Sequence, residues 1–165
     1  MPSDALGIAI VQAYTWLTAY EGLLPREVLE QRVERLPVRA EQMAVSIENG
    51  ERFIVALSRG TVVGFAVWYP RARSEEYPSD GEIGALYVLK GFQGRGIGAR
   101  LFHLCRAALA ESGCSHFLAN CLQGNPAAHF YVRMGGSAAA QRRDTLVGGA
   151  EIIEDVFRFP ALSDP

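Results

Sequence analysis

Residues 86–101 read Leu86-Tyr87-Val88-Leu89-Lys90-Gly91-Phe92-Gln93-Gly94-Arg95-Gly96-Ile97-Gly98-Ala99-Arg100-Leu101. An apolar, β-rich run enters a glycine-rich turn, and the turn opens directly into an amphipathic helix. Because its glycines lack side chains, the backbone N–H groups of the turn can point outward together. The first helical turn adds its own unpaired N–H groups and the positive end of the helix dipole. This pattern predicts a site for a phosphate or pyrophosphate group.

Length and composition predict a single globular domain over residues 1–165. The chain has 165 residues and a formal charge of −2, so it can bury a hydrophobic core and has no strongly basic balance that would suggest nucleic acid. No apolar run approaches the ~20 residues of a membrane span, and no basic segment precedes an N-terminal apolar stretch. The three cysteines and three histidines show no metal-ligand spacing, which favours buried free thiols and a cytoplasmic location.

Hydrophobic periodicity and turn residues predict a mixed α/β fold. Residues 82–89, the helix from residue 97 and residues 115–121 form a βαβ crossover, so the two strands should be parallel. Asp4 is a candidate N-cap for the first helix, and residues 70–81 are predicted to be an exposed loop. The remaining predicted elements are helices at 5–20, 26–35, 39–48 and 125–134, and strands at 53–57, 62–68, 137–146 and 150–158, the last two paired around Gly148-Gly149.

Taken alone, the glycine turn leaves the phosphate ligand open. Gly94-x-Gly96-x-x-Ala99 also satisfies a relaxed dinucleotide-binding fingerprint. That interpretation requires an acidic residue at the end of the next strand, where the chain has Asn120-Cys121-Leu122, and further βα units for which too few residues remain. A P-loop is excluded because no Gly-Lys-Ser/Thr follows the glycines.

Gln93-Gly94-Arg95-Gly96-Ile97-Gly98 resembles the Gln/Arg-x-x-Gly-x-Gly/Ala signature of the GCN5-related N-acetyltransferase (GNAT) superfamily. The segment from Asn125 to Gly136 resembles the second motif of that superfamily, an Asn-led helix that carries Phe-Tyr before a glycine. Trp16 to Pro25 is similar to a recurrent stretch in bacterial members. The resemblance covers about residues 10–158, and the order of helices and strands agrees with it.

The resemblance implies a central mixed β-sheet flanked by helices. Members usually begin with a strand before the first helix, whereas this chain starts almost at that helix. The strand is therefore expected either to be missing or to precede the recorded start. A missing strand would leave a sheet edge that the partner in a homodimer could cover. Lys90 stands where many members carry proline.

The resemblance also implies acetyl-coenzyme A as the cofactor and assigns candidate residues to it. Leu86, Tyr87 and Val88 are expected to offer backbone groups to the pantetheine amides. Asn125 caps the short helix and touches the pantetheine arm. The pyrophosphate is expected to bind the turn formed by Gln93, Gly94, Arg95, Gly96, Ile97, Gly98 and Ala99.

Glu82 and Tyr131 are the candidate catalytic residues. Glu82 opens the strand that precedes the turn, a position where members often carry a general base acting through water, although a solvated strand-end acid is the alternative. Tyr131 matches the tyrosine that protonates the thiolate in the family, and a core aromatic is its alternative. Asp80 and Glu21 are weaker substitutes for the base.

The predicted reaction is acetyl transfer from acetyl-CoA to a primary amine, directly within a ternary complex. The alternative from another class is a domain that binds or senses acyl-CoA without turnover. The expected partner is a small-molecule or peptide amine, with neither nucleic acid nor a membrane involved. The acceptor pocket is expected to be lined by Trp16, Tyr20 and Glu21. Aromatic rings with one acid suit a cationic amine, although the same aromatic residues could equally belong to a hydrophobic core.

Overall fold

A computed structural model describes residues 1–72, 76–78, 80–145 and 151–161 of the chain. It confirms the predicted mixed α/β fold, because six strands form one mixed sheet in the order β1-β2-β3-β4-β6-β5 and helices flank it. The elements in chain order are η1 (Pro2–Asp4), α1 (Ala5–Ala19), α2 (Arg26–Glu34), α3 (Leu36–Glu48), β1 (Arg52–Ser58), β2 (Thr61–Tyr69), β3 (Gly81–Val88), η2 (Lys90–Phe92), α4 (Ile97–Glu111), β4 (His116–Leu122), α5 (Ala127–Arg133), β5 (Ser137–Thr145) and β6 (Glu151–Pro160).

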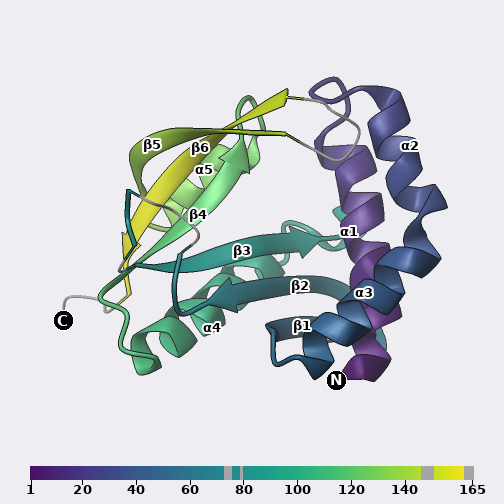
Figure 1. Cartoon of the computed structure of the whole chain (residues 1–165), viewed down its shortest axis with the longest axis horizontal. Helices are drawn as coiled ribbons and strands as arrows, with labels where there is room; N and C mark the ends of the chain where they lie inside the picture. The colour runs from purple at the N-terminus through teal and green to yellow at the C-terminus, as the bar shows by residue number, and fades with distance from the viewer. Residues whose placement is uncertain (73–75, 79, 146–150, 162–165) are drawn as a thin grey trace. The chain divides into compact units, whose positions relative to one another are not determined.

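The chain divides into two compact units, and the first comprises residues 1–67 and 86–102. Its helices α1, α2 and α3 lie side by side (Figure 1). Helix α1 packs closely on β2, since a Cβ on Gly7 would lie 2.7 Å from Val62 Cγ2. The β1–β2 hairpin turns at Arg59 and Gly60, whose φ angles of 50° and 81° are typical of a two-residue hairpin turn.

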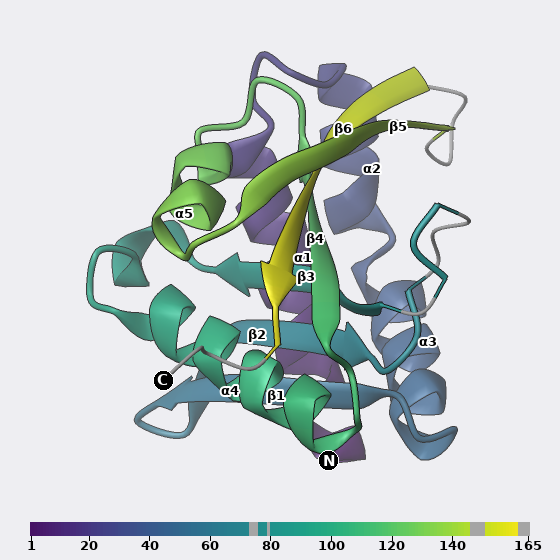
Figure 2. The same cartoon turned by 90° about the vertical axis from the view of Figure 1, so that its left-hand side faces the viewer.

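The second unit comprises residues 68–85 and 103–165. The first residues of β3, Gly81–Ile83, pair in parallel with β4, which confirms the predicted crossover. Strand β6 is antiparallel to both β4 and β5 and lies between them (Figure 2). Its core includes Phe117 and Phe159, stacked with ring centroids 4.9 Å apart.

Three local predictions need correction. The Asp4 carboxylate does not cap α1; it accepts a hydrogen bond from the Met1 ammonium (2.8 Å). Helix α3 starts at residue 36, before the predicted residue 39, because Pro37 is tolerated in a first helical turn. The segment 70–81 is not simply an exposed loop, since Ala72 and Asp80 are buried. The predicted turn at Gly148-Gly149 lies outside the described residues.

Strand β1 lies at one end of the strand order. Within the described part of the chain, no strand precedes α1, and Pro2–Asp4 form a short 3-10 helix instead. Homodimer formation across this edge stays a prediction. No helix among the described residues is long and apolar enough to cross a membrane.

Gly136 is expected to be essential for packing next to α5. A Cβ at this position would lie 2.5 Å from Phe159 Cζ and 3.0 Å from the Tyr131 carbonyl oxygen. We expect Gly136→Ala to lower the free energy of unfolding by roughly 1–3 kcal/mol, the usual cost of overpacking. For a chain of this size, thermal denaturation should show a fall in Tm of about 3–10 °C.

Gly91→Ala is the matched control, because a Cβ on Gly91 meets no atom within 4 Å. Equal melting temperatures for the two variants would show that the ring of Phe159 moves aside at little cost, contrary to this account.

Candidate functional site

The glycine turn follows β3 in the first unit and has the backbone that a phosphate cradle requires. Gly94 and Gly96 have φ angles of 73° and 78°, in the left-handed region that favours glycine. Helix α4 then begins at Ile97, and the Arg100 N–H donates to the Gly96 carbonyl oxygen (3.0 Å). The N–H groups at the start of α4, before Arg100, have no carbonyl one turn earlier to accept them. The positive end of the dipole of this 15-residue helix lies at the same place. Because both features favour an anion, the turn fits a pyrophosphate.

Side chains of the turn hold its own backbone in place. Gln93 Nε2 donates to the Val88 carbonyl oxygen (2.9 Å), which ties the turn to the end of β3. Arg95 Nη2 donates to the Gly91 carbonyl oxygen (3.0 Å). The Gln93 N–H itself donates to the Lys90 carbonyl oxygen (3.3 Å), which adds a backbone hydrogen bond to the turn.

The first residues of strand β3 pair with β4, and its last residues lie beyond that pairing. Among the described residues, its parallel pairing with β4 covers Gly81–Ile83, and Leu86–Val88 lie beyond it. In the first unit, the Leu89 N–H donates to Val63 on β2, and a Cβ on Gly64 would lie 3.0 Å from the Tyr87 carbonyl oxygen. The end of β3 thus runs close beside β2.

Tyr87 is at the centre of an aromatic cluster in the first unit. Its hydroxyl accepts a hydrogen bond from Trp16 Nε1 (3.1 Å) and lies 3.3 Å from the hydroxyl of Tyr20. The guanidinium carbon of Arg32 lies 3.9 Å from the centroid of the Trp16 ring. Sequence reasoning found Trp16 and Tyr20 but missed Arg32, because no local motif pairs residues that meet only when α2 folds against α1.

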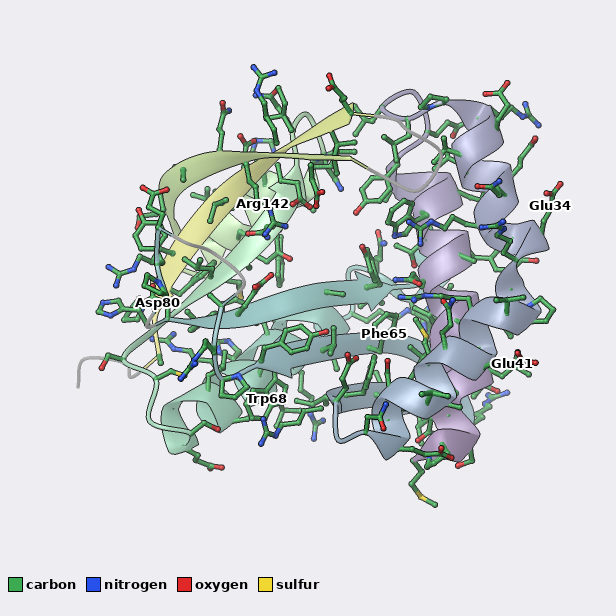
Figure 3. All side chains as sticks on the ribbon, viewed as in Figure 1. Glu34, Glu41, Phe65, Trp68, Asp80 and Arg142 are labelled. Atoms are coloured by element: carbon green, nitrogen blue, oxygen red, sulfur yellow. The ribbon has the colours of Figure 1, made fainter. Side chains whose placement is uncertain are left out.

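Glu82 and Asp80 occupy different environments in the second unit. The Glu82 side chain is only 1% exposed, which excludes the alternative of a solvated strand-end acid. Asp80 forms a bidentate pair with Arg158, at 2.7 and 3.2 Å, and this hydrogen bonding raises the pKa of the Arg158 guanidinium (Figure 3 labels Asp80). The bidentate pair with Arg158 makes Asp80 a poor candidate for a general base.

Helix α5 carries Tyr131 and is capped by Asn125. Asn125 Oδ1 accepts a hydrogen bond from the Ala127 N–H (2.9 Å), so Asn125 satisfies the first N–H of the helix, although Pro126 and not Asn125 occupies the N-cap position and the helix begins at Ala127. Tyr131 is buried, and its ring packs 5.6 Å from Phe157 and 6.1 Å from Phe159, both on β6. These aromatic contacts hold the ring in place.

The cysteines are buried thiols, as predicted, and are poor nucleophiles. Burial raises the pKa of Cys105 to about 12 and that of Cys121 to about 11, and it also raises the pKa of Cys114. At pH 8 the thiolate fraction of Cys121 is about one in a thousand. We expect native protein to react negligibly with a thiol-specific chromogenic reagent, and unfolded protein to titrate its three thiols. Rapid labelling of native protein at pH 8 would contradict this.

Comparison with known proteins agrees with the fold and the motifs. Residues 11–136 match the model of the acetyltransferase (GNAT) family. The chain is 30% identical over 128 residues to an uncharacterized N-acetyltransferase, YuaI, of Bacillus subtilis (strain 168), covering 78% of this chain and 72% of that protein. The chain therefore belongs to the acetyltransferase (GNAT) family.

Solved structures show the same fold at lower identity. A GCN5-related N-acetyltransferase from Rhodopseudomonas palustris superposes with a TM-score of 0.77 at 19% identity, covering 97% of this chain and 91% of that one. The putative acetyltransferase yncA from Salmonella typhimurium, solved with its cofactor acetyl-CoA, gives a TM-score of 0.68 at 15% identity, covering 100% and 92%.

Proposed function

We propose that this chain is an N-acetyltransferase that moves the acetyl group of acetyl-CoA to a primary amine by direct transfer. The observation that carries the proposal is the turn from Gly94 to Gly96, whose left-handed glycines open into the N-terminus of α4. Membership of the acetyltransferase family and the acetyl-CoA in the yncA structure support the same cofactor. We propose that residues 1–165 act as one catalytic domain.

In this proposal, residues of β3 and α4 hold the cofactor. The amides from Gly94 to Ala99 bind the pyrophosphate, with Gln93 anchoring the turn to Val88 and Arg95 adding positive charge. Backbone groups of Leu86, Tyr87 and Val88 bind the pantetheine amides, and one N–H there polarises the thioester carbonyl. Asn125 contributes to the pantetheine site in addition to its cap. Bound acetyl-CoA supplies the activated acetyl group and the thiol leaving group.

Glu82 acts as the general base, through a water molecule. A lysine-like amine with a pKa of ~10.4 costs ~4–5 kcal/mol to deprotonate at pH 7, so a carboxylate that receives the proton assists the attack. Glu82 lies four residues before Leu86 on the same strand, and its burial limits its contact with bulk water.

Tyr131 acts as the general acid. The leaving group is a thiolate whose conjugate acid resembles cysteine, with a pKa of ~8.5, and it gains from a proton donor as the bond breaks. The Tyr131 hydroxyl is the proposed donor, and its ring is positioned by Phe157 and Phe159.

A thermal-shift titration with acetyl-CoA tests the cofactor, with NADH, NADPH and ATP as controls. At a hundredfold excess over Kd, binding should stabilise the native state by ~2.7 kcal/mol and raise Tm by about 5–10 °C. A response to a dinucleotide and none to acetyl-CoA would overturn the proposal. Saturable binding without transfer to any amine would instead support the non-catalytic acyl-CoA-binding alternative.

A further inference from the structure

The aromatic cluster of the first unit contains the positive charge of Arg32. Arg32 is half-buried, and its guanidinium lies over the face of Trp16. Among the described residues, none supplies a carboxylate to it within ion-pair distance. Glu30 and Glu34, each two residues from Arg32 in sequence, are exposed, and Glu30 pairs with Arg26. Glu41 on α3 is also exposed, and Figure 3 labels Glu34 and Glu41.

A second arginine increases the positive character of this region. Arg39, on α3, donates from Nε to Gln12 Oε1 (2.9 Å) and from Nη1 to Gln42 Oε1 (3.3 Å), so its hydrogen-bond partners are neutral. Burial lowers the pKa of Arg32, and repulsion from Arg39 lowers it further, with Tyr87 and Tyr20 the groups that oppose the shift. A half-buried guanidinium without a counter-charge is costly unless an anion binds to it.

The cluster is connected to the strand assigned to the cofactor. Tyr87 belongs to the segment Leu86–Val88, and its hydroxyl contacts both Trp16 and Tyr20. Arg32 in turn stacks on Trp16. The side chains that meet Tyr87 are therefore in the right place to contact the amine that attacks the thioester.

We propose that Arg32 binds the carboxylate of the acceptor, so that the substrate class is a carboxylate-bearing amine such as an α-amino acid. The inference rests on the proposed function. A guanidinium presents a planar fork of donors that matches a carboxylate. A single partly buried guanidinium, with Arg39 tied to two glutamines, suits a monoanion better than a doubly charged phosphate. The acceptor then carries a carboxylate in addition to the cationic amine that the sequence favours.

The test compares α-amino acids with their carboxamides as acceptors, in wild-type protein and in Arg32→Gln. The measured quantity is the ratio of kcat/KM for an acid to kcat/KM for its amide. The two amines differ in intrinsic reactivity, but this difference is the same in both proteins. It therefore cancels when the ratio for Arg32→Gln is divided by the ratio for the wild type. We expect Arg32→Gln to lower kcat/KM for the acids by about 10–100-fold and to change it for the amides by less than about threefold. The affinity for coenzyme A should not change.

Arg35→Gln is the matched control, because it removes the same charge from an exposed side chain at the C-cap of α2. It should leave the ratio unchanged. A purely structural role of Arg32 over Trp16 would lower kcat/KM for acids and amides alike, and that result would overturn the inference. Thermal denaturation of each variant confirms that it folds.

Failure of the inference can be told apart from failure of the proposed function. If coenzyme A does not bind to the wild-type protein, the proposed function itself fails. If coenzyme A binds but no acid is bound or acetylated in preference to its amide, the carboxylate assignment is wrong and the cofactor assignment stands.

Discussion

Replacing Tyr131 with phenylalanine is expected to lower kcat for acetyl transfer by about 10²–10⁴-fold, the usual contribution of a positioned general acid. The substitution removes one hydroxyl and keeps the ring, so the packing against Phe157 and Phe159 should survive. Steady-state release of coenzyme A measures the loss, and calorimetric titration should show that the affinity for coenzyme A changes by less than about threefold.

A more acidic leaving group separates the catalytic role from a structural one. An acyl donor whose thiol has a lower pKa needs less protonation, so the deficit of Tyr131→Phe should shrink with such a donor. Tyr14→Phe, at an exposed tyrosine on α1, is the control and should match the wild type with both donors. Unchanged turnover in Tyr131→Phe would remove the acid role from this residue.

Glu82→Gln is expected to produce a second large loss, which depends on pH. At pH 7 kcat/KM for a lysine-like amine should fall by about 10²–10⁴-fold, because the ammonium form has lost its proton acceptor. As the pH rises toward the amine pKa of ~10.4, more of the acceptor is already deprotonated and the loss should diminish. Glutamine keeps the size of a side chain that is 1% exposed and introduces no new charge.

Asp80→Asn is the control for Glu82→Gln, since the two acids are close in sequence and Asp80 is paired with Arg158. We expect it to lower Tm by breaking a partly buried pair while leaving the pH profile of kcat/KM in its wild-type shape. If Asp80→Asn produced the pH-dependent loss and Glu82→Gln did not, the base would be misassigned.

The elements that local pattern determines were predicted well from the sequence. The glycine turn and the start of α4 depend on residues within a few positions of one another, and the structure contains both. The position of β6 between β4 and β5 was not predicted, because periodicity indicates strands and does not order them in a sheet.

The candidate site shows the same division between local and distant interactions. The capping role of Asn125 follows from an Asn-Pro pair and was predicted. The pairing of Asp80 with Arg158 and the stacking of Arg32 on Trp16 join residues far apart in the chain, and no sequence signal marks either contact. The near-complete burial of Glu82 was also missed, since β3 appears apolar on both faces apart from this residue.

The most direct test of the account is a mass-spectrometric assay of wild-type protein with acetyl-CoA and a series of acceptors. The series contains α-amino acids, their carboxamides and other primary amines. The account predicts that N-acetylated amine and free coenzyme A appear in equal amounts, and only when protein, acetyl-CoA and amine are all present. Saturable binding of acetyl-CoA with no acetylated product from any amine would contradict it and identify the chain as a binding domain.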